Sequence, residues 1–443
     1  MIYALAGVAA LVIIGALMLV MRRWPDALPL LAIFALPFRL PISTDGRTVN
    51  LLIPLYLVIA AGTLVHLLPR WLGRNVVTEP RRPPIGLEWL LLTAVVLYAL
   101  QATYSADRTK AAENIAFFYI PFGLLFMLLR DVRWTKELVL KCLGVAVALG
   151  VVFAGIGFVE YYRKALFLNP KVIAADQYGN YFRVNSLFFD PNIYGRFLAI
   201  VMVAVTTVVL WTRSRREVLI FAVVLAWLLA GLVTSFSQSS IAALLLGMAV
   251  LAAYRWDVRA TVYVTGALVA IAVVLVLAAP ASLHFGVNGA NGSTSNATSG
   301  RTKLITGGLE LFADRPLYGY GSGSFETEYR RHGNASAANA TSASHTIPIT
   351  VAAEQGIVGL AVYVALLISA FAVLFRGAGR SPPRIALAAC FAALVLHTWT
   401  YADFLEDPIT WTLLGIGVGL ARVGSEDGDG DGSDGRAGAQ LAG

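Results

Sequence analysis

The run TIPITVAAEQGIVGLAVYVALL, from Thr346 to Leu367, carries one charged side chain, Glu354, in an otherwise apolar stretch. A helix needs about 20 such residues to cross the hydrocarbon core of a bilayer, so the run predicts a membrane span that continues to residue 375. The same rule predicts about twelve or thirteen spans, because the second is short and rich in proline and the pair around 235–240 could be one broken element. The spans lie at about 2–21, 27–41, 50–69, 85–103, 114–129, 137–160, 192–212, 217–233, 237–254, 259–279, 347–375, 384–402 and 408–421.

The composition indicates the same environment. Of the 443 residues, 58% are hydrophobic and 14% are charged, and the mean hydropathy of +0.72 excludes a soluble surface. The net charge is +8, but the bases are scattered between apolar runs, so we expect membrane lipids as partners and no nucleic acid. Cys142 and Cys390 lie in apolar runs, which offers neither a disulfide framework nor a zinc site. The expected fold is an all-α, polytopic membrane helical bundle.

Basic residues orient the spans. Alternate short loops carry most of the 34 Lys and Arg residues, from Arg22 and Arg23 to Arg422, and the positive-inside rule places those loops in the cytoplasm. The bases on the opposite side concentrate in two long segments, 161–196 and 280–345. Bases held against the topological bias suggest a functional role.

Six regions follow from this topology, and two of them are long extracytoplasmic segments. The last region is acidic and is expected to be disordered. The regions are N-terminal transmembrane helices at 1–160, an extracytoplasmic segment at 161–191, central transmembrane helices at 192–279, a large extracytoplasmic loop with short helices at 280–345, C-terminal transmembrane helices at 346–422 and the acidic tail at 423–443.

The second external segment contains a predicted helix opened by Arg301, a stop at residues 314–316, and a turn with Gly319, Gly321 and Gly323. Such a turn can bring backbone N–H groups close to a phosphate, although a plain turn is favoured on this pattern alone. Arg301 can point a forked, permanently charged donor at a phosphate. An isolated arginine there is otherwise a solvated surface charge.

His345 marks the point where this polar segment becomes apolar, so its imidazole is expected at the membrane surface. An imidazole there could serve as the general base for an extracytoplasmic sugar hydroxyl. For a single histidine without context, however, a ring that is hydrogen-bonded to the backbone at a helix start is favoured. Glu354 lies nine residues further on, inside the predicted span. A carboxylate in that position should face a wet cavity or pair with a base from another helix.

The first external segment leads into the helix expected from residue 192. Asp190 is predicted to cap this helix and Pro191 to occupy its first turn. Arg183 precedes the helix and Arg196 lies inside it. We expect one of the two to bind an anion and the other to anchor the helix, and we favour Arg183 as the ligand.

Taken in order, these residues resemble the O-antigen ligase and polymerase superfamily of bacterial envelope enzymes. RVNSL, from Arg183 to Leu187, is similar to the family's Arg-x-x-x-Leu, and His345 with Gly356 and Gly359 is similar to the ligase signature. Two departures are Thr346, where the signature prefers Asn, Ser or Gln, and Gln238, where relatives commonly carry arginine. The resemblance also includes Asp190-Pro191-Asn192 and the turn PLYGYGSGSF, and it runs from about the sixth span to the twelfth.

The resemblance implies a GT-C-like glycosyltransferase in the bacterial plasma (inner) membrane, with its active site on the extracytoplasmic side. The donor would be a glycan on undecaprenyl pyrophosphate, and the acceptor a sugar hydroxyl of lipid A core or another glycan. By likeness, His345 would activate the hydroxyl, while Arg183 and Arg301 hold the pyrophosphate. No metal or other cofactor is expected, because guanidinium groups can stabilise the leaving charge, and transfer would invert the anomeric centre. Supporting candidates are Asp190, Asn192, Arg196, Gly321 and Glu354.

Other functions stay open at the level of sequence. Within the same superfamily the chain could be a polymerase of O-antigen or exopolysaccharide, or a protein O-oligosaccharyltransferase. A transporter of lipid-linked glycans would need charged residues through the depth of the bilayer, whereas these cluster at the outer surface. A noncatalytic scaffold of an envelope assembly complex is the third alternative.

Overall fold

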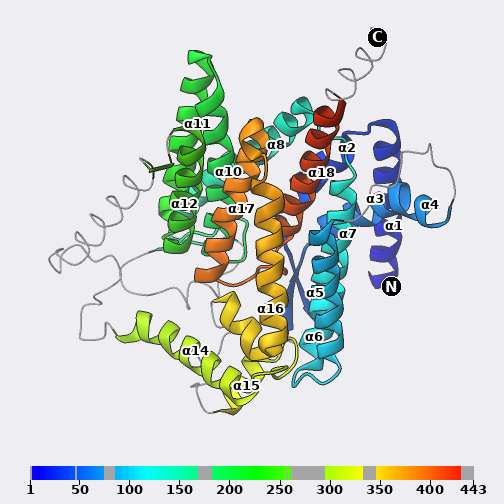
Figure 1. Ribbon diagram of the computed structural model, residues 1–443, viewed down its shortest axis with the longest axis vertical. Helices are drawn as coiled ribbons and strands as arrows, with labels where there is room; N and C mark the ends of the chain where they lie inside the picture. Colours follow the sequence, from blue (N-terminus) through cyan, green and yellow to red (C-terminus); the bar gives the residue numbers. More distant parts are fainter. Residues whose placement is uncertain are drawn as a thin grey trace, which may run out of the picture.

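The computed structural model describes residues 2–44, 47–73, 85–167, 182–256, 258–259, 261, 295–332 and 346–430. Within these ranges the protein is a bundle of helices with a single small β-hairpin (Figure 1). The predicted all-α membrane bundle is therefore confirmed. The hairpin pairs β1 (Leu40–Thr44) antiparallel with β2 (Arg47–Leu51), with Leu40 opposite Leu51.

The N-terminal half contains helices that mostly coincide with predicted spans. Two of these spans are composite, because a π-helical turn joins consecutive segments into Ile53–Trp71 and Arg108–Arg130. The helices are α1 (Ile2–Arg23), α2 (Ala27–Ala35), α3 (Ile53–Gly62), α4 (Leu68–Trp71), α5 (Gly86–Ala102), α6 (Arg108–Asn114), α7 (Ile120–Arg130) and α8 (Lys136–Arg163).

The C-terminal half contains the remaining spans and two helices of the large external segment. The last helix, α18, continues to Gly430, inside the acidic tail predicted from residue 423. The helices are α10 (Pro191–Trp211), α11 (Arg215–Thr234), α12 (Gln238–Arg255), α14 (Ser295–Asp314), α15 (Phe325–Arg331), α16 (Ile347–Phe375), α17 (Pro382–Thr400) and α18 (Pro408–Gly430).

Eight helices in the described residues are long and apolar enough to cross a membrane, so the protein is a multi-pass membrane protein. Helices also occupy the spans predicted at 2–21, 85–103 and 408–421. The span predicted at 27–41 is wrong: α2 has nine residues, about 13.5 Å of helix against a core of about 30 Å. The span predicted at 259–279 lies almost wholly outside the described residues.

Helix α10 occupies the centre of the bundle and packs against α8, α11, α12 and α17, while α18 packs against α7. Its buried side includes Tyr194 and Leu198, both with no exposed surface. Helix α1 presents Leu11 and Leu19, each 70% exposed, as expected for side chains that face lipid rather than water. The apolar exterior and the packed centre together define a membrane bundle.

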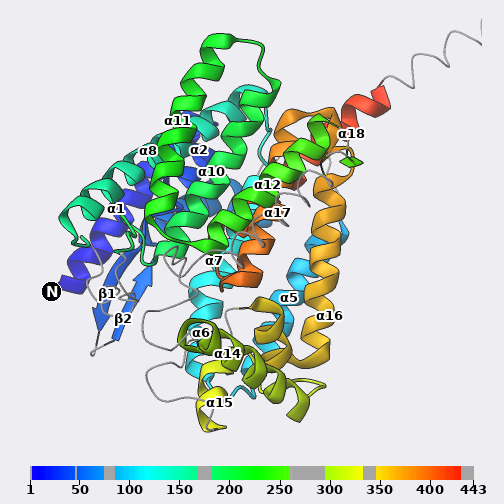
Figure 2. The ribbon, with the colours of Figure 1, turned by 90° about the vertical axis from the view of Figure 1, so that its left-hand side faces the viewer.

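Buried and half-buried ion pairs gather at one end of the bundle. At the end predicted to be cytoplasmic, Glu88 of α5 contacts Arg130 at 2.8 Å and Arg422 at 2.7 Å, and Asp131 contacts Arg70 at 2.7 Å. Helices α14 and α15 lie at the opposite end, beside the start of α16 and beside α6 (Figures 1 and 2). The candidate site residues are found toward this second end.

Candidate functional site

Arg183 lies in an irregular segment that leads into α10, and its guanidinium is half-buried. Its Nε donates to the carbonyl oxygen of Ser235 at 3.0 Å and its Nη2 donates to Oδ1 of Asn192 at 3.2 Å. The buried carboxylate of Glu160 accepts the N–H of Ser186 at 2.7 Å and thereby holds this segment against α8. Arg183 is therefore oriented by fixed acceptors on both sides.

Asp190 caps α10 as predicted: its Oδ1 accepts the backbone N–H of Asn192 at 2.6 Å, and Pro191 occupies the first position of the helix. The cap fixes the backbone of Asn192. The Asn192 side chain then accepts both from Arg183 and from the Ser237 hydroxyl, which lies 2.9 Å away. The role of Asp190 is thus to place Asn192, which in turn orients Arg183.

The serine-rich turn between α11 and α12 forms a buried polar network. The hydroxyl of Ser237 contacts that of Ser240 at 2.7 Å, and Ser240 contacts Nε2 of His397 at 3.1 Å. His397 lies on α17 and has no exposed surface. His397 was not predicted as a site residue, because a lone histidine in an apolar helix gives no local signal of its partners.

Arg196 is an anchor rather than an anion ligand. Its side chain is 1% exposed and its Nη2 lies 2.6 Å from Oδ2 of Asp407. Its Nη1 donates to the carbonyl oxygens of Ala402 and Asp403, each at 3.4 Å. The guanidinium of Arg196 therefore ties α10 to the loop at 401–407, which connects α17 to α18.

The predicted glycine-rich turn is confirmed, since Gly319, Gly321 and Gly323 all have positive φ. The turn lies against α16, and the Gly321 N–H donates to the carbonyl oxygen of Glu354 at 2.8 Å. A Cβ on Gly321 would lie 2.4 Å from Cα of Ser105, so only glycine fits this approach. Because the Gly321 N–H is already bonded, this residue acts as part of a plain turn, the alternative that the sequence favoured, and not as a phosphate ligand.

Glu354 is 7% exposed and joins the same turn to α16. Its two carboxylate oxygens accept the backbone N–H groups of Gly323 at 2.9 Å and Phe325 at 3.0 Å. Of the two alternatives expected for Glu354, a cavity or a basic partner, the structure shows the cavity, and two backbone N–H groups bind the carboxylate. Helix α16 breaks just beyond this point, at Gly356, which has φ of 66°.

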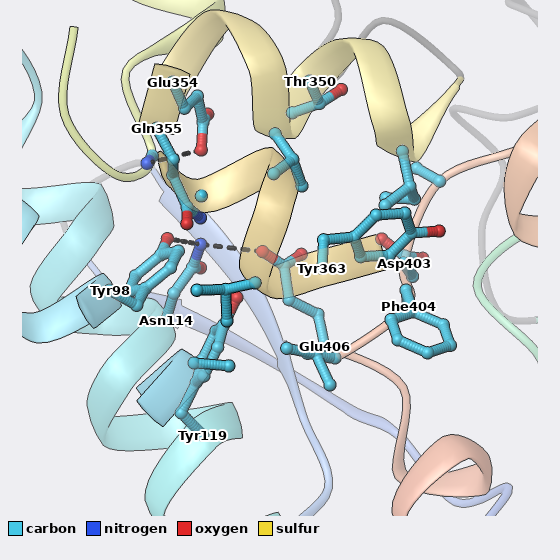
Figure 3. A pocket seen from close by; sticks show the side chains of 18 of the residues that line it. Tyr98, Asn114, Tyr119, Thr350, Glu354, Gln355, Tyr363, Asp403, Phe404 and Glu406 are labelled. Carbon is cyan, nitrogen blue, oxygen red and sulfur yellow. Dashed lines mark hydrogen bonds between the residues drawn. The ribbon is translucent and has the colours of Figure 1, made fainter. Parts of the chain in front are cut away.

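A cavity of about 130 Å³ lies between α5, α6, the start of α16 and the loop at 401–407. Figure 3 shows Asn114 between Tyr98 and Glu406: its Nδ2 donates to the hydroxyl of Tyr98 and to Oε1 of Glu406, both at 2.8 Å. The cavity combines ionisable, amide and aromatic side chains. They include Tyr98, Asp107, Lys110, Asn114, Tyr119, Glu326, Glu354, Tyr363, Asp403, Phe404 and Glu406.

Carboxylates dominate this cavity, and Lys110 is the one basic residue among the residues that line it in the described structure. Burial, and next the charge of Asp403, raise the pKa of Glu406 to about 7. Among the described side chains, those of this cavity included, no three His, Cys, Asp or Glu residues are grouped so as to hold a metal ion. Asn114 and Tyr98 were not predicted as site residues, because the resemblance begins only at about the sixth span and residues 85–103 and 114–129 were predicted only as membrane spans.

The structure does not describe the side chains of two residues that the sequence predicts for the site. His345 lies outside the described residues, although Thr346 and Ile347, which follow it, begin α16. Arg301 lies in α14, whose first residue is Ser295 rather than Arg301, and its side chain is not described. The convergence of Arg183, Arg301 and His345 on one cavity therefore stays a prediction.

Residues 223–364 match the Wzy_C family model, described as O-antigen ligase. The matched range runs from α11 to the middle of α16 and includes the glycine-rich turn and Glu354. No curated protein matches the chain. Over residues 223–364 the chain is thus similar to the O-antigen ligase family.

Proposed function

We propose that this protein transfers a glycan from undecaprenyl pyrophosphate to a sugar hydroxyl of lipid A core or another envelope glycan. One observation carries the proposal: the matched residues supply Gly323, Glu354 and Tyr363 to the wall of the polar cavity. A cavity with converging polar groups at one end of a membrane bundle suits a substrate that is lipid-anchored and hydrophilic at its head.

Arg183 and Arg301 are proposed to hold the pyrophosphate. The leaving group gains negative charge as the anomeric bond breaks, and guanidinium groups fixed in advance stabilise that charge without the cost of reorganisation. The contacts of Arg183 with Ser235 and Asn192 supply such fixation. Since the arginines provide the positive charge, we propose a transfer that needs no metal ion.

His345 is proposed to be the general base that removes the proton of the acceptor hydroxyl. It precedes Ile347, which lines the cavity, by two residues, and two residues of chain span at most about 7 Å. Attack by the activated hydroxyl opposite the pyrophosphate inverts the anomeric centre. The loops rich in bases lie at the other end of the bundle, which supports an extracytoplasmic site in a bacterial inner membrane.

The proposal is tested with purified protein in lipid nanodiscs, a lipid-linked glycan donor and a panel of acceptors. Loss of general-base help in His345→Ala should lower the rate about 10² to 10⁴-fold. The matched control is Thr207→Val, a buried residue of α10 whose hydroxyl bonds only to Val203 of its own helix among the described contacts. If His345→Ala transferred glycan at the wild-type rate, His345 would not be the general base. If glycan were transferred only onto the donor's own glycan, the protein would be a polymerase and not a ligase.

A further inference from the structure

Asn114 is the residue of the cavity whose bonding is incomplete. Its side chain is 2% exposed, and both described bonds of the amide are made by Nδ2. Its Oδ1 is buried and has no partner among the described residues. A buried carbonyl oxygen without a hydrogen-bond donor costs about 1–3 kcal/mol, so a group that donates a hydrogen bond belongs beside it.

Aromatic rings form part of the same wall (Figure 3). Tyr98 and Tyr119 stack with their centroids 4.3 Å apart, and Tyr363 meets Phe404 edge to face at 5.6 Å. Rings of this kind provide rigid apolar surface, while the tyrosine hydroxyls remain able to hydrogen-bond. The cavity thus offers both polar acceptors and flat apolar walls.

The side chains that line the cavity disfavour three classes of ligand: anions, acyl chains and metal ions. Its lining carries five acidic residues against Lys110, which disfavours a phosphate or another anion. An acyl chain would leave buried polar groups such as Asn114 without partners, at a cost. A metal ion needs converging ligands, and the described part of the chain has no group of three or more His, Cys, Asp or Glu residues that could hold one.

A neutral sugar ring satisfies all of these constraints. Its hydroxyl groups donate to carboxylate and amide oxygens, and its C–H faces pack on aromatic rings. The volume of about 130 Å³ exceeds the share of about 30 Å³ that one water takes in the liquid, so the cavity has room for a group larger than one water molecule.

We propose that this cavity is a subsite for one neutral pyranose ring, with Asn114 Oδ1 and Glu406 as acceptors of its hydroxyl groups. This inference rests on the proposed function for the origin of the ring, which belongs either to the acceptor glycan or to the donor glycan. In both cases the chemistry that recognises the ring is the same.

Binding is tested first, without turnover. Full-length protein in nanodiscs is mixed with methyl glycosides of glucose, galactose and mannose, and saturation-transfer NMR detects the ring protons. We expect at least a five-fold weaker signal for Asn114→Leu, which keeps the size of the side chain but accepts no hydrogen bond. Glu406→Gln, which keeps the shape at this position, should also weaken the signal, whereas Thr207→Val should match the wild type.

Melting temperatures of all variants are measured alongside, and Glu406→Gln serves if Asn114→Leu does not fold. The inference is overturned if no glycoside gives a signal with the wild type. It is equally overturned if the folded variants give the wild-type signal, because the cavity residues then have no part in binding the ring.

Transfer kinetics with Asn114→Ser identify the source of the ring. A raised KM for the acceptor alone assigns the subsite to the acceptor glycan, and a raised KM for the donor alone assigns it to the donor. Glycoside binding that depends on Asn114 in a protein without transfer activity would refute the proposed function but keep the subsite. Active transfer, together with glycoside binding that Asn114→Leu does not weaken, would refute the subsite alone.

Discussion

Arg196 and Asp407 form an ion pair whose side chains are 1% and 3% exposed. Two charges withdrawn from water in this way lose hydration that their attraction repays only in good geometry. The Arg196 guanidinium also donates to two carbonyl oxygens of the loop at 401–407. The pair therefore fixes the loop that carries Glu406 into the cavity, at the expense of burying both charges.

Removing one member of the pair leaves the other charge buried alone. We expect Arg196→Met to destabilise the protein by about 3–5 kcal/mol, and the double variant Arg196→Met/Asp407→Leu to recover most of that loss. Melting temperatures in detergent, with Thr207→Val as the control, should be lowest for Arg196→Met and higher for the double variant. A single variant as stable as the wild type would show that Arg196 does not hold the loop.

Residue-scale predictions from sequence succeeded where the partner is local. The cap made by Asp190 spans two residues, and residue preferences alone were enough to predict it. The contact between Asn114 and Glu406 joins residues 292 positions apart, so no pattern near either one announces it. For Glu354 the prediction succeeded in part. Its position in a membrane span indicated that the carboxylate needs a partner, but the local sequence did not indicate that two backbone N–H groups are the partners.

At the scale of elements, the break in α16 creates the wall of the site. Gly356 has φ of 66° and ψ of −163°, and a Cβ there would lie 2.4 Å from the backbone of Leu317. The N–H of Ile357 donates to the carbonyl oxygen of Pro316 at 2.8 Å, which joins the break to the segment before the glycine-rich turn. The break, rather than simple helix packing, is therefore the reason for glycine at this position.

Gly356→Ala should both strain the backbone and push the turn away from α16. We expect a loss of at least about 1–3 kcal/mol of stability from the conformation alone, with a further loss from the contact. Gly144→Ala is the matched control, because that glycine lies inside α8 with nothing within 4 Å of the place its new methyl group would take, and alanine favours a helix. Equal melting temperatures for the two variants would contradict the role given to the break.

Apolar length predicted most of the membrane helices, because each long span must satisfy its backbone internally wherever it lies in the bundle. The rule failed at 27–41, where α2 ends at Ala35 and the chain turns into the hairpin. Pro37 and Pro41 follow that end, and proline removes a backbone donor that a continuing helix needs. A rule that counts only apolar residues cannot predict that the helix ends at Ala35.

At the scale of the whole molecule, function depends on which end of the bundle faces outward. Ion pairs with Arg70, Arg130 and Arg422 gather at one end, and the cavity lies toward the other. The positive-inside rule assigns the first end to the cytoplasm. A cavity on the outer side is required for a donor glycan presented there on a lipid.

Cysteine labelling tests this orientation directly. Cys142 and Cys390 are 6% and 2% exposed, so the natural thiols should give little background. Tyr318→Cys places a thiol in the glycine-rich turn, where the native side chain is 62% exposed, and Arg216→Cys places one at the exposed start of α11. In spheroplasts of a bacterial host, a membrane-impermeant maleimide should label Tyr318→Cys while the cells are intact. It should label Arg216→Cys only after the membrane is permeabilised, because α11 begins at the cytoplasmic end. The reverse pattern would place the cavity on the cytoplasmic side and would contradict the proposed transfer from a lipid-linked donor at the outer face.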